Sequence, residues 1–223
     1  MTNTRLRVLI ACERSQVEQQ AFAALGHWAF SLDIEPCYGP DPSHHIVADA
    51  YDFPLSGWDL IIAHPPCTEL SHVRNGDRNK PGRLTPVVRA LRLWARFLFE
   101  SPCPVAVENP VGICSEILPP TQIISPHLFG EPYMKRTCLW LRGLPCLMTT
   151  CECLRPKHWV GSGRTSGVAE TVLRVPRHLR SQARSQSFKS IAAEMASQWT
   201  GYLLGLAKGS AFDLSSADPF ARP

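Results

Sequence analysis

Two short segments of this 223-residue chain carry residue types suited to covalent chemistry. Cys67 ends the segment His-Pro-Pro-Cys (64–67), and Glu108 begins the segment Glu-Asn-Pro (108–110). A thiolate is a strong nucleophile, and a carboxyl group nearby can donate or accept a proton. Together the two groups suit addition to an electron-poor ring, in which the thiolate attacks and the acid neutralises the charge that develops.

Strand-like runs of apolar residues precede both segments. Residues 58–63 lead into the first segment, and residues 104–107 lead into the second. In open α/β sheets, ligands bind in the crevice beyond the carboxyl ends of the strands. We therefore expect the thiol and the carboxylate to lie just past the ends of two neighbouring buried strands.

The rest of the chain alternates between strand and helix patterns. Further strands are predicted at residues 5–10, 28–33, 45–49 and 137–141, and helices at 15–25, 85–98 and 191–203. Such alternation predicts βαβ units and an α/β fold with a Rossmann-like, doubly wound, mostly parallel sheet. We expect one domain over residues 1–208, with a small basic, loop-rich insertion at about 142–187, and a flexible tail at 209–223.

Length and composition narrow the class of protein. A chain of 223 residues can bury one full core, and no stretch approaches the roughly 18 apolar residues of a membrane span. The N-terminus lacks the pattern of a signal peptide, so we predict a cytoplasmic protein without a membrane partner. The nine cysteines are then expected to be free, catalytic or metal-bound thiols rather than disulfides.

Basic residues are concentrated in the segment 155–189, which contains a single acid, Glu170. The basic residues are Arg155, Lys157, Arg164, Arg174, Arg177, Arg180, Arg184 and Lys189. A segment of one charge sign favours a phosphate-bearing partner, either a nucleotide or a nucleic acid. A solvated basic surface is the alternative explanation.

The order of these motifs resembles that of the cytosine C5-methyltransferase family over roughly residues 5–141 and the last helix. Pro-Cys at 66–67 is similar to the catalytic loop of the family, Glu108 and Asn109 to its Glu-Asn motif, and Arg136 to its arginine motif. The resemblance implies the class I S-adenosylmethionine-dependent methyltransferase fold. It also implies that Cys67 adds to C6 of cytosine while Glu108 acts at N3, with Asn109 and Arg136 assisting.

The same resemblance implies S-adenosylmethionine as the cofactor, and we assign no residue as a metal ligand. The turn after the first strand stands where the family has a glycine-rich turn. Asp33 is similar to the acid that binds the cofactor ribose, and Asp49 to the acid near the adenine amine. The cofactor-binding residues implied in this way are Ala11, Cys12, Glu13, Ser15, Asp33, Ile34, Asp49, Ala50 and Pro65.

Three departures from the family pattern shape the functional hypothesis. The first turn contains no glycine, Cys138 replaces the second arginine of the arginine motif, and only about residues 142–187 remain for target recognition. This compact layout is similar to small phage-type members. It favours a free cytidine nucleotide such as (d)CMP as the substrate, with segment 155–189 holding its phosphate. The alternatives are a small DNA cytosine-5-methyltransferase and a non-catalytic nucleic-acid-binding protein on a methyltransferase scaffold.

Each candidate residue also has a purely structural explanation. Cys67 can be a buried structural thiol, Glu108 a helix cap or an arginine partner, Asp33 and Asp49 turn residues, and Arg136 a surface residue. His64 is expected to line the pocket as a neutral, hydrogen-bonded histidine. Four further residues, Cys146, Cys151, Cys153 and His158, have the ligand types of a zinc site but lack Cys-x-x-Cys spacing, so zinc binding stays open, as does the oligomeric state.

Overall fold

The computed structural model describes residues 5–71, 82, 84–151, 158–159 and 187–207. The strands in these ranges are β1 (Arg7–Ala11), β2 (Trp28–Asp33), β3 (His45–Val47), β4 (Leu60–Ala63), β5 (Val105–Pro110), β6 (Gln122–Ile124), β7 (Tyr133–Met134), β8 (Thr137–Arg142) and β9 (His158–Trp159). The α-helices are α1 (Val17–Ala24), α2 (Cys67–Leu70), α3 (Leu84–Ala95), α4 (Ile113–Ile117) and α7 (Lys189–Ala207). A π-helical turn (Arg96–Glu100) continues α3, and two short 3₁₀ helices occur at Pro42–His44 and Pro126–Phe129.

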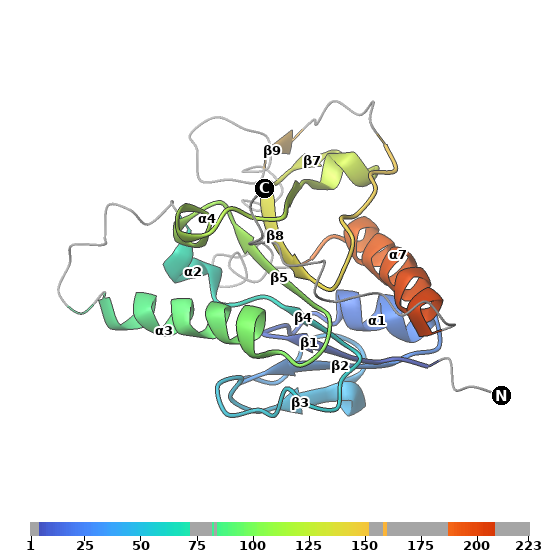
Figure 1. Ribbon diagram of the computed structural model, residues 1–223, viewed down its shortest axis with the longest axis horizontal. Helices are drawn as coiled ribbons and strands as arrows, with labels where there is room; N and C mark the ends of the chain where they lie inside the picture. Colours follow the sequence, from blue (N-terminus) through green and yellow to red (C-terminus); the bar gives the residue numbers. More distant parts are fainter. Residues whose placement is uncertain (1–4, 72–81, 83, 152–157, 160–186, 208–223) are drawn as a thin grey trace.

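Seven strands form one sheet in the order β3-β2-β1-β4-β5-β8-β6 (Figure 1). The pairs from β3 to β5 are parallel, whereas β8 runs antiparallel to both β5 and β6. This sheet confirms the predicted α/β class, with a Rossmann-like and mostly parallel strand order. The short strands β7 and β9 form a separate parallel pair.

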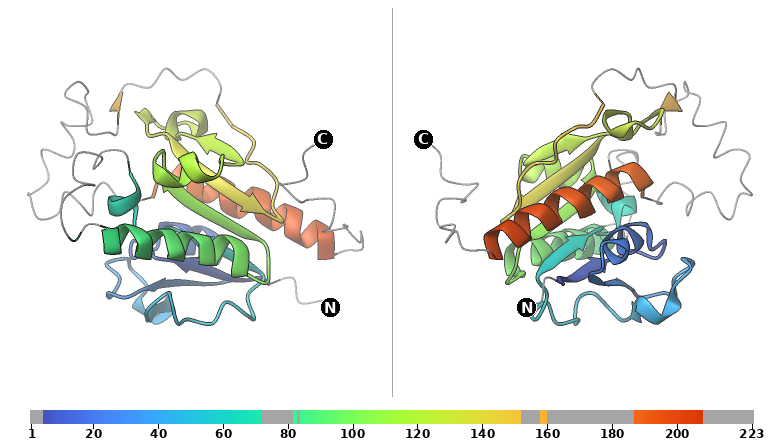
Figure 2. Two further views of the ribbon diagram at one scale, coloured as in Figure 1. Left: turned by 60° about the vertical axis from the view of Figure 1, so that its left-hand side comes forward. Right: turned by 90° about the vertical axis from the view of Figure 1, so that its right-hand side faces the viewer.

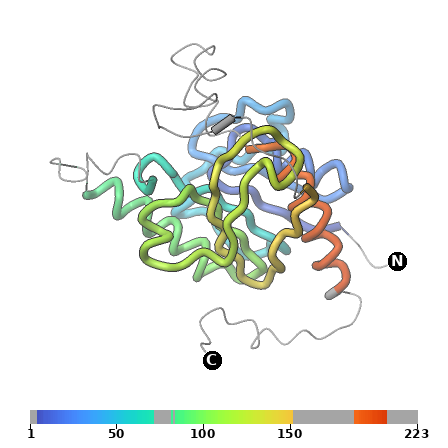
Figure 3. The backbone as a smooth tube through the Cα atoms, turned by 90° about the horizontal axis from the view of Figure 1, so that it is seen from above, coloured from blue at the N-terminus to red at the C-terminus, as the bar shows by residue number. Residues whose placement is uncertain are grey.

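The sheet is covered on both faces, because its side chains alternate between two hydrophobic cores. In β1, Leu9 belongs to the core under α3, and Val8 belongs to the core under α1 and α7. Figure 2 shows α3 and α7 on opposite faces of the sheet. In Figure 3 the C-terminal helix lies beside the N-terminal part of the chain, and Phe22 of α1 and Trp199 of α7 are both fully buried in the shared core.

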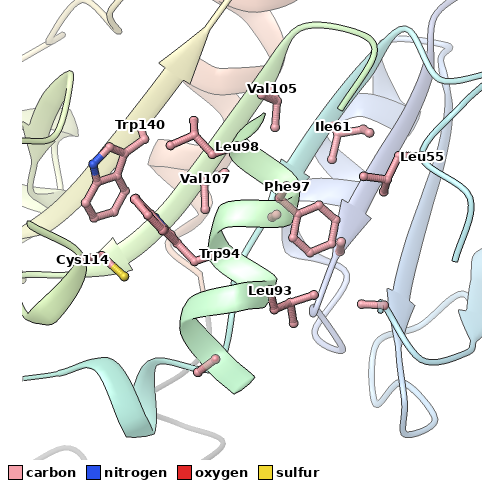
Figure 4. Packing of buried hydrophobic residues seen from close by; sticks show 14 of the residues in the cluster. Leu55, Ile61, Leu93, Trp94, Phe97, Leu98, Val105, Val107, Cys114 and Trp140 are labelled. Atoms are coloured by element: carbon pink, nitrogen blue, oxygen red, sulfur yellow. The ribbon is translucent and has the colours of Figure 1, made fainter. Parts of the chain in front are cut away.

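The core under α3 fixes the position of β8 (Figure 4). The rings of Trp94 on α3 and Trp140 on β8 meet edge to face, with 5.3 Å between centroids. The indole N–H of Trp140 also donates to the carbonyl oxygen of Leu118 at 2.9 Å. Aromatic pairs of this geometry stabilise beyond their buried area, so β8 is held firmly against α3.

Pairing with β8 extends β5 further than its apolar residues predict. Glu108, Asn109 and Pro110 pair with residues of β8, with Glu108 opposite Leu139. The expectation that Glu108 lies just past a strand end is therefore wrong, because the antiparallel neighbour keeps these polar residues in the strand. Cys67, in contrast, does follow the end of β4 after three residues, at the first position of α2.

Several predictions fall outside the described residues. They concern the tail at 209–223, nearly all of the basic segment 155–189, Cys153 and the side chain of His158. The eight cysteines that the structure describes are free thiols, as expected. Among the described helices, none is long and apolar enough to cross a membrane.

Candidate active site

A cleft of about 570 Å³ lies at the carboxyl ends of the parallel strands. One half of the cleft, which we call the turn half, is formed by the turn after β1 and the residues that follow β2. The other half, the strand half, is formed by the loop after β4, the end of β5, the start of β8 and the residues around the start of α7. The cleft therefore lies where ligands bind in α/β folds.

The turn after β1 adopts left-handed backbone conformations without any glycine. Cys12 has a φ of 59° and Gln16 a φ of 63°. Residues other than glycine in this region each cost about 1–3 kcal/mol, so the surrounding structure must hold them there. This is the same turn in which the sequence lacks the glycines of the resembling family.

Glu13 holds the turn from within. Its carboxylate accepts the backbone N–H of Gln16 at 2.7 Å, the N–H of Ser15 and the hydroxyl of Ser15. The residue is buried, and burial together with the charge of Glu18 raises the pKa of Glu13 to about 7. The amides of the turn are thus satisfied by the chain itself rather than left free for a ligand.

The loop after β2 packs closely on the turn and reinforces it. The side-chain amide of Gln16 donates to the carbonyl oxygen of Asp41 at 2.6 Å and accepts the N–H of Asp41 at 2.8 Å. A Cβ atom on Gly39 would lie 2.5 Å from the carbonyl oxygen of Ser15. Only glycine fits at position 39.

Asp33 and Ile34 form the outer end of the turn half. Both residues line the cleft, and Ile34 is 67% exposed. Burial raises the pKa of Asp33. The backbone N–H of Glu35, which donates to Asp33 Oδ1 at 3.0 Å, lowers it by a smaller amount. A carboxylate beside an exposed apolar side chain can bind hydroxyl groups next to a flat ring.

The predicted cofactor-binding residues divide between cleft and scaffold. Cys12, Glu13, Asp33, Ile34 and Pro65 line the cleft. The remaining residues, Ala11, Ser15, Asp49 and Ala50, lie outside its lining.

Asp49 illustrates why some of these residues lie outside. It pairs with Arg89 of α3 at 2.9 Å, on the other side of the strand ends. Its charge still reaches the thiol of Cys12, whose pKa is raised by burial and by Asp33 and Asp49. Asp49 therefore influences the turn half through its charge, without lining the cleft.

The strand half presents Cys67 on a short, well-held loop. Cys67 is exposed in the cleft, whereas Asn109 is fully buried and donates from Nδ2 to the carbonyl oxygen of Pro65 at 2.8 Å. A Cβ atom on Gly112 would lie 2.0 Å from the carbonyl oxygen of Leu70, so α2 packs directly on the chain after β5. Asn109 thus positions the Cys67 loop without lining the cleft.

Alternation along β8 decides which basic residue lines the strand half. Leu139 belongs to the core under α1 and α7, and Cys138 to the opposite core. By the same period of two, Lys135 and Thr137 face the cleft on the side of Leu139. Arg136, which matches the arginine motif, is exposed outside the cleft. Lys135 is the basic residue that lines the cleft, and the motif did not identify it.

The two groups expected to carry chemistry influence each other. Loss of water and the charge of Glu108 raise the pKa of the Cys67 thiol, while the charge of Lys135 acts in the opposite direction. Burial raises the pKa of Glu108, but His64, Lys135 and Thr137 together bring it below its ordinary value. Cys67 is therefore mainly a thiol at neutral pH, and Glu108 is ionised.

His64 differs from its expected neutral state. It lines the cleft between Glu18 and Glu108, and its pKa is raised to about 9 because these carboxylates outweigh the effect of burial. A cationic imidazolium therefore lies beside Glu108. The two acids of the turn half, Glu13 and Glu18, face the same group, and the sequence alone did not connect Glu18 with the site.

Comparison with known proteins finds no matching family model and no matching curated protein. Among solved structures, the chain is similar to the Dnmt2 methyltransferase of S. pombe, with 19% identity and a TM-score of 0.42 over 61% of this chain and 50% of that one. It is also similar to a putative DNA modification methyltransferase encoded within a prophage of E. coli, with 16% identity and a TM-score of 0.42 over 72% of this chain and 56% of that one. The chain thus spans about half the length of each of these structures.

Proposed function

We propose that the chain is an S-adenosylmethionine-dependent cytosine C5-methyltransferase that acts through a covalent bond between Cys67 and C6. The observation that carries this proposal is the single cleft shared by an exposed thiol, a partly buried carboxylate and a lysine. Cys67, Glu108 and Lys135 come from three different strand ends, yet their charges act on one another. Such a group of a nucleophile, an acid and a cation is suited to addition to a pyrimidine ring.

The chain's own residues account for the steps of this reaction. The sulfur of Cys67 forms a bond with C6, and the electron pair of the C5–C6 double bond moves onto the ring. Glu108 neutralises the charge that develops at N3 by supplying a proton. Once C5 has accepted the methyl group, solvent takes the C5 proton, the electron pair of that C–H bond re-forms the C5–C6 double bond, and the thiolate of Cys67 leaves with the electrons of the C6–S bond.

Lys135 has a direct part in forming the nucleophile. The thiolate rather than the thiol attacks, yet the pKa of Cys67 is raised in this site. The cationic side chain of Lys135 lowers that pKa and is held over the ring of Phe188, 5.7 Å from its centroid. Lys135 thus favours the charged form of the nucleophile.

The turn half fits the proposed cofactor at one end. Asp33 would bind the ribose hydroxyls, and Ile34 would contact the adenine ring, since a carboxylate lies there beside an exposed apolar side chain. The turn itself offers fewer donors to a cofactor, because the backbone N–H groups of Ser15 and Gln16 already donate to the carboxylate of Glu13. When bound, S-adenosylmethionine supplies the activated methyl group that C5 accepts.

A free cytidine nucleotide such as (d)CMP is the substrate that we propose. Only residues 142–187 lie between β8 and the approach to α7, which is short for a module that holds a duplex and accepts a flipped base. The basic segment 155–189 would hold the nucleotide phosphate. The eight basic residues of this segment also favour a second candidate, DNA, which a small recognition loop would bind.

A transfer assay tests the proposal and separates the two substrates. We expect label from S-adenosylmethionine to appear on cytidine mono- or triphosphates and not on duplex DNA. Label on DNA alone would favour the second candidate, and its binding should then weaken steeply with salt. Label on neither substrate would contradict the proposed reaction.

A non-catalytic binding protein is a third candidate, and one specific observation favours it. The carboxylate of Glu13 fills the turn where a methyltransferase would leave backbone amides for its cofactor. Calorimetric titration with S-adenosylmethionine tests this candidate directly. We expect saturable binding that Asp33→Asn weakens, and a lack of binding by the unmodified protein would support the third candidate.

A further inference from the structure

His64 connects the two halves of the cleft through a pair of carboxylates. Its Nδ1 lies 3.4 Å from Oε2 of Glu108, and its Nε2 lies 3.4 Å from Oε1 of Glu18. The side chains of His64, Glu18 and Glu108 are 16%, 2% and 18% exposed. The three groups form a buried line that runs from α1 to the strand half.

Strand alternation explains why these side chains meet. Leu60 and Ile62 of β4 pack in the core under α1 and α7, and His64 continues the same period of two past the strand end. Ala106 of β5 packs in that core as well, and Glu108 follows it on the same face. Both side chains therefore point toward α1, which carries Glu18.

The cluster holds more carboxylates than cations. Glu18, Glu108 and Glu13 all raise the pKa of His64, while Lys135 faces Glu108 from the β8 side. Within the described part of the chain, Oε2 of Glu18 and Nε2 of His64 are buried without a hydrogen-bond partner, so Nε2 and Oε1 of Glu18 are close in charge contact rather than hydrogen-bonded. The imidazolium is thus the cation that lies between the carboxylates of Glu18 and Glu108.

The proposed reaction needs a proton that Glu108 does not itself hold at neutral pH. Its pKa lies below the ordinary value, so the carboxylate is ionised before substrate binds. The charge that develops at N3 nevertheless has to be neutralised as Cys67 adds to C6. A neighbouring group must therefore supply the proton through Glu108.

We propose that His64 is a positioning residue that supplies Glu108 with this proton, and that Glu18 keeps the imidazole oriented and protonated. This inference rests on the proposed function. As the bond from sulfur to C6 forms, the carboxylate of Glu108 takes the Nδ1 proton of His64 and passes a proton to N3, which leaves a neutral imidazole and Glu108 again ionised. When the thiolate leaves, the proton returns from N3 through Glu108 to the imidazole, so that no net proton is consumed by the relay.

A first measurement tests the cluster without requiring turnover. Histidine resonances are followed by NMR over pH, and the signal of His64 is assigned as the one missing in His64→Gln. We expect it to titrate near pH 9, and to titrate at lower pH in both Glu18→Gln and Glu108→Gln. His27, whose pKa is lowered by burial and whose ring contacts Leu6 and Thr200 instead, should titrate unchanged in these variants. Titration of His64 near the ordinary value, or no response to Glu18→Gln, would overturn the inference.

A second measurement separates a proton relay from a merely structural role. Single-turnover methyl transfer is compared between His64→Gln and the unmodified protein from pH 7 to 9. We expect the ratio of the two rates to fall by about tenfold for each pH unit, because Glu108 alone loses its proton at lower pH. Glu18→Gln should move the alkaline limb to lower pH while keeping the imidazole, and His44→Gln should match the unmodified protein.

The outcomes distinguish this inference from the function on which it rests. Transfer by the unmodified protein with a rate ratio that is constant over pH would overturn the relay alone. Absence of transfer by the unmodified protein on every cytosine substrate would overturn both the proposed function and the relay. A falling ratio for His64→Gln together with the shifted limb for Glu18→Gln would establish both positioning roles.

Discussion

The two halves of the cleft differ in how their polar groups are satisfied. In the turn half, the carboxylate of Glu13 accepts three donors from Ser15 and Gln16, so the turn is complete without a ligand. In the strand half, Cys67 is exposed and Glu108 contacts His64 at a long distance of 3.4 Å. The turn half is therefore built mainly for stability, and the strand half keeps reactive groups available.

This difference also appears in what holds each half in place. The turn is held by Glu13, which bonds to residues two and three positions away, and by Gln16, which bonds to Asp41 in the loop after β2. The Cys67 loop instead depends on residues beyond α3, because Asn109 bonds to Pro65 and Gly112 packs on Leu70. Substitutions in the two halves should consequently affect different measurements.

The largest expected effect comes from the nucleophile. Cys67→Ala should lower methyl transfer by at least about 10³-fold, since the covalent step is lost, while binding of S-adenosylmethionine stays within about twofold. A radiolabel assay and calorimetric titration measure the two quantities. Cys103→Ala, which removes a thiol outside the cleft, is the matched control. Residual activity close to that of the control would exclude a covalent mechanism.

Glu108→Gln should have the next largest effect. The amide keeps the shape of the side chain but holds no transferable proton, so the single-turnover rate should fall by about 10²–10⁴-fold. Glu100→Gln changes an exposed acid that pairs with Arg96 at 3.6 Å, and it should leave the rate unchanged. Equal rates for the two variants would mean that the strand half has no general acid.

Lys135 and Arg136 provide a direct comparison between neighbours. Lys135→Met should raise the pKa of Cys67 further and lower the transfer rate by about tenfold or more, whereas Arg136→Met should have little effect. The pH dependence of thiol alkylation measures the first change, because its midpoint should move to higher pH. A larger loss of activity in Arg136→Met than in Lys135→Met would mean that Arg136, and not Lys135, is the functional cation.

A smaller effect on stability is expected in the turn half. Glu13→Ala leaves the buried N–H groups of Ser15 and Gln16 without an acceptor, which should lower the free energy of unfolding by about 1–3 kcal/mol. Urea denaturation measures the change. Glu35→Ala removes an exposed partner of Arg14 and should cost at most about 1 kcal/mol. If both variants cost the same, the turn does not depend on its internal carboxylate.

The same residue gives the smallest and most specific prediction, a dependence of stability on pH. The pKa of Glu13 is raised in the folded state to about 7 from its ordinary value of 4.5, so the folded protein binds more protons between these values. Its contribution to stability is therefore fully present below pH 4.5 and is lost as pH rises toward 7. Glu13→Gln should flatten this part of a plot of unfolding temperature against pH. An unchanged slope would mean that Glu13 is not the group that titrates.

Much of the fold follows from local patterns in the sequence. The parallel strands β1, β2 and β4 coincide with apolar runs, and the helix around Trp199 follows its periodic apolar residues. Glycine at 112 and 39 marks two close backbone approaches that a sequence cannot specify without knowing the partner. The strands β6 and β7 are too short to give a pattern, so they emerge only in the structure.

For the site, the sequence by itself determined the two chemical groups, the thiol of Cys67 and the carboxylate of Glu108, and their nearness to strand ends. It also determined the acid at the end of β2, Asp33. These features depend on residue type and on short runs of hydrophobic residues, which are local properties.

Only the tertiary structure decided which other side chains join them. Lys135 enters the cleft in place of Arg136 because β8 pairs antiparallel with β5 in one register, and a shift of one residue would exchange them. Glu18 reaches His64 because α1 packs over the face on which β4 presents that histidine. Register and helix packing depend on contacts between distant segments, and no local pattern in the sequence encodes them.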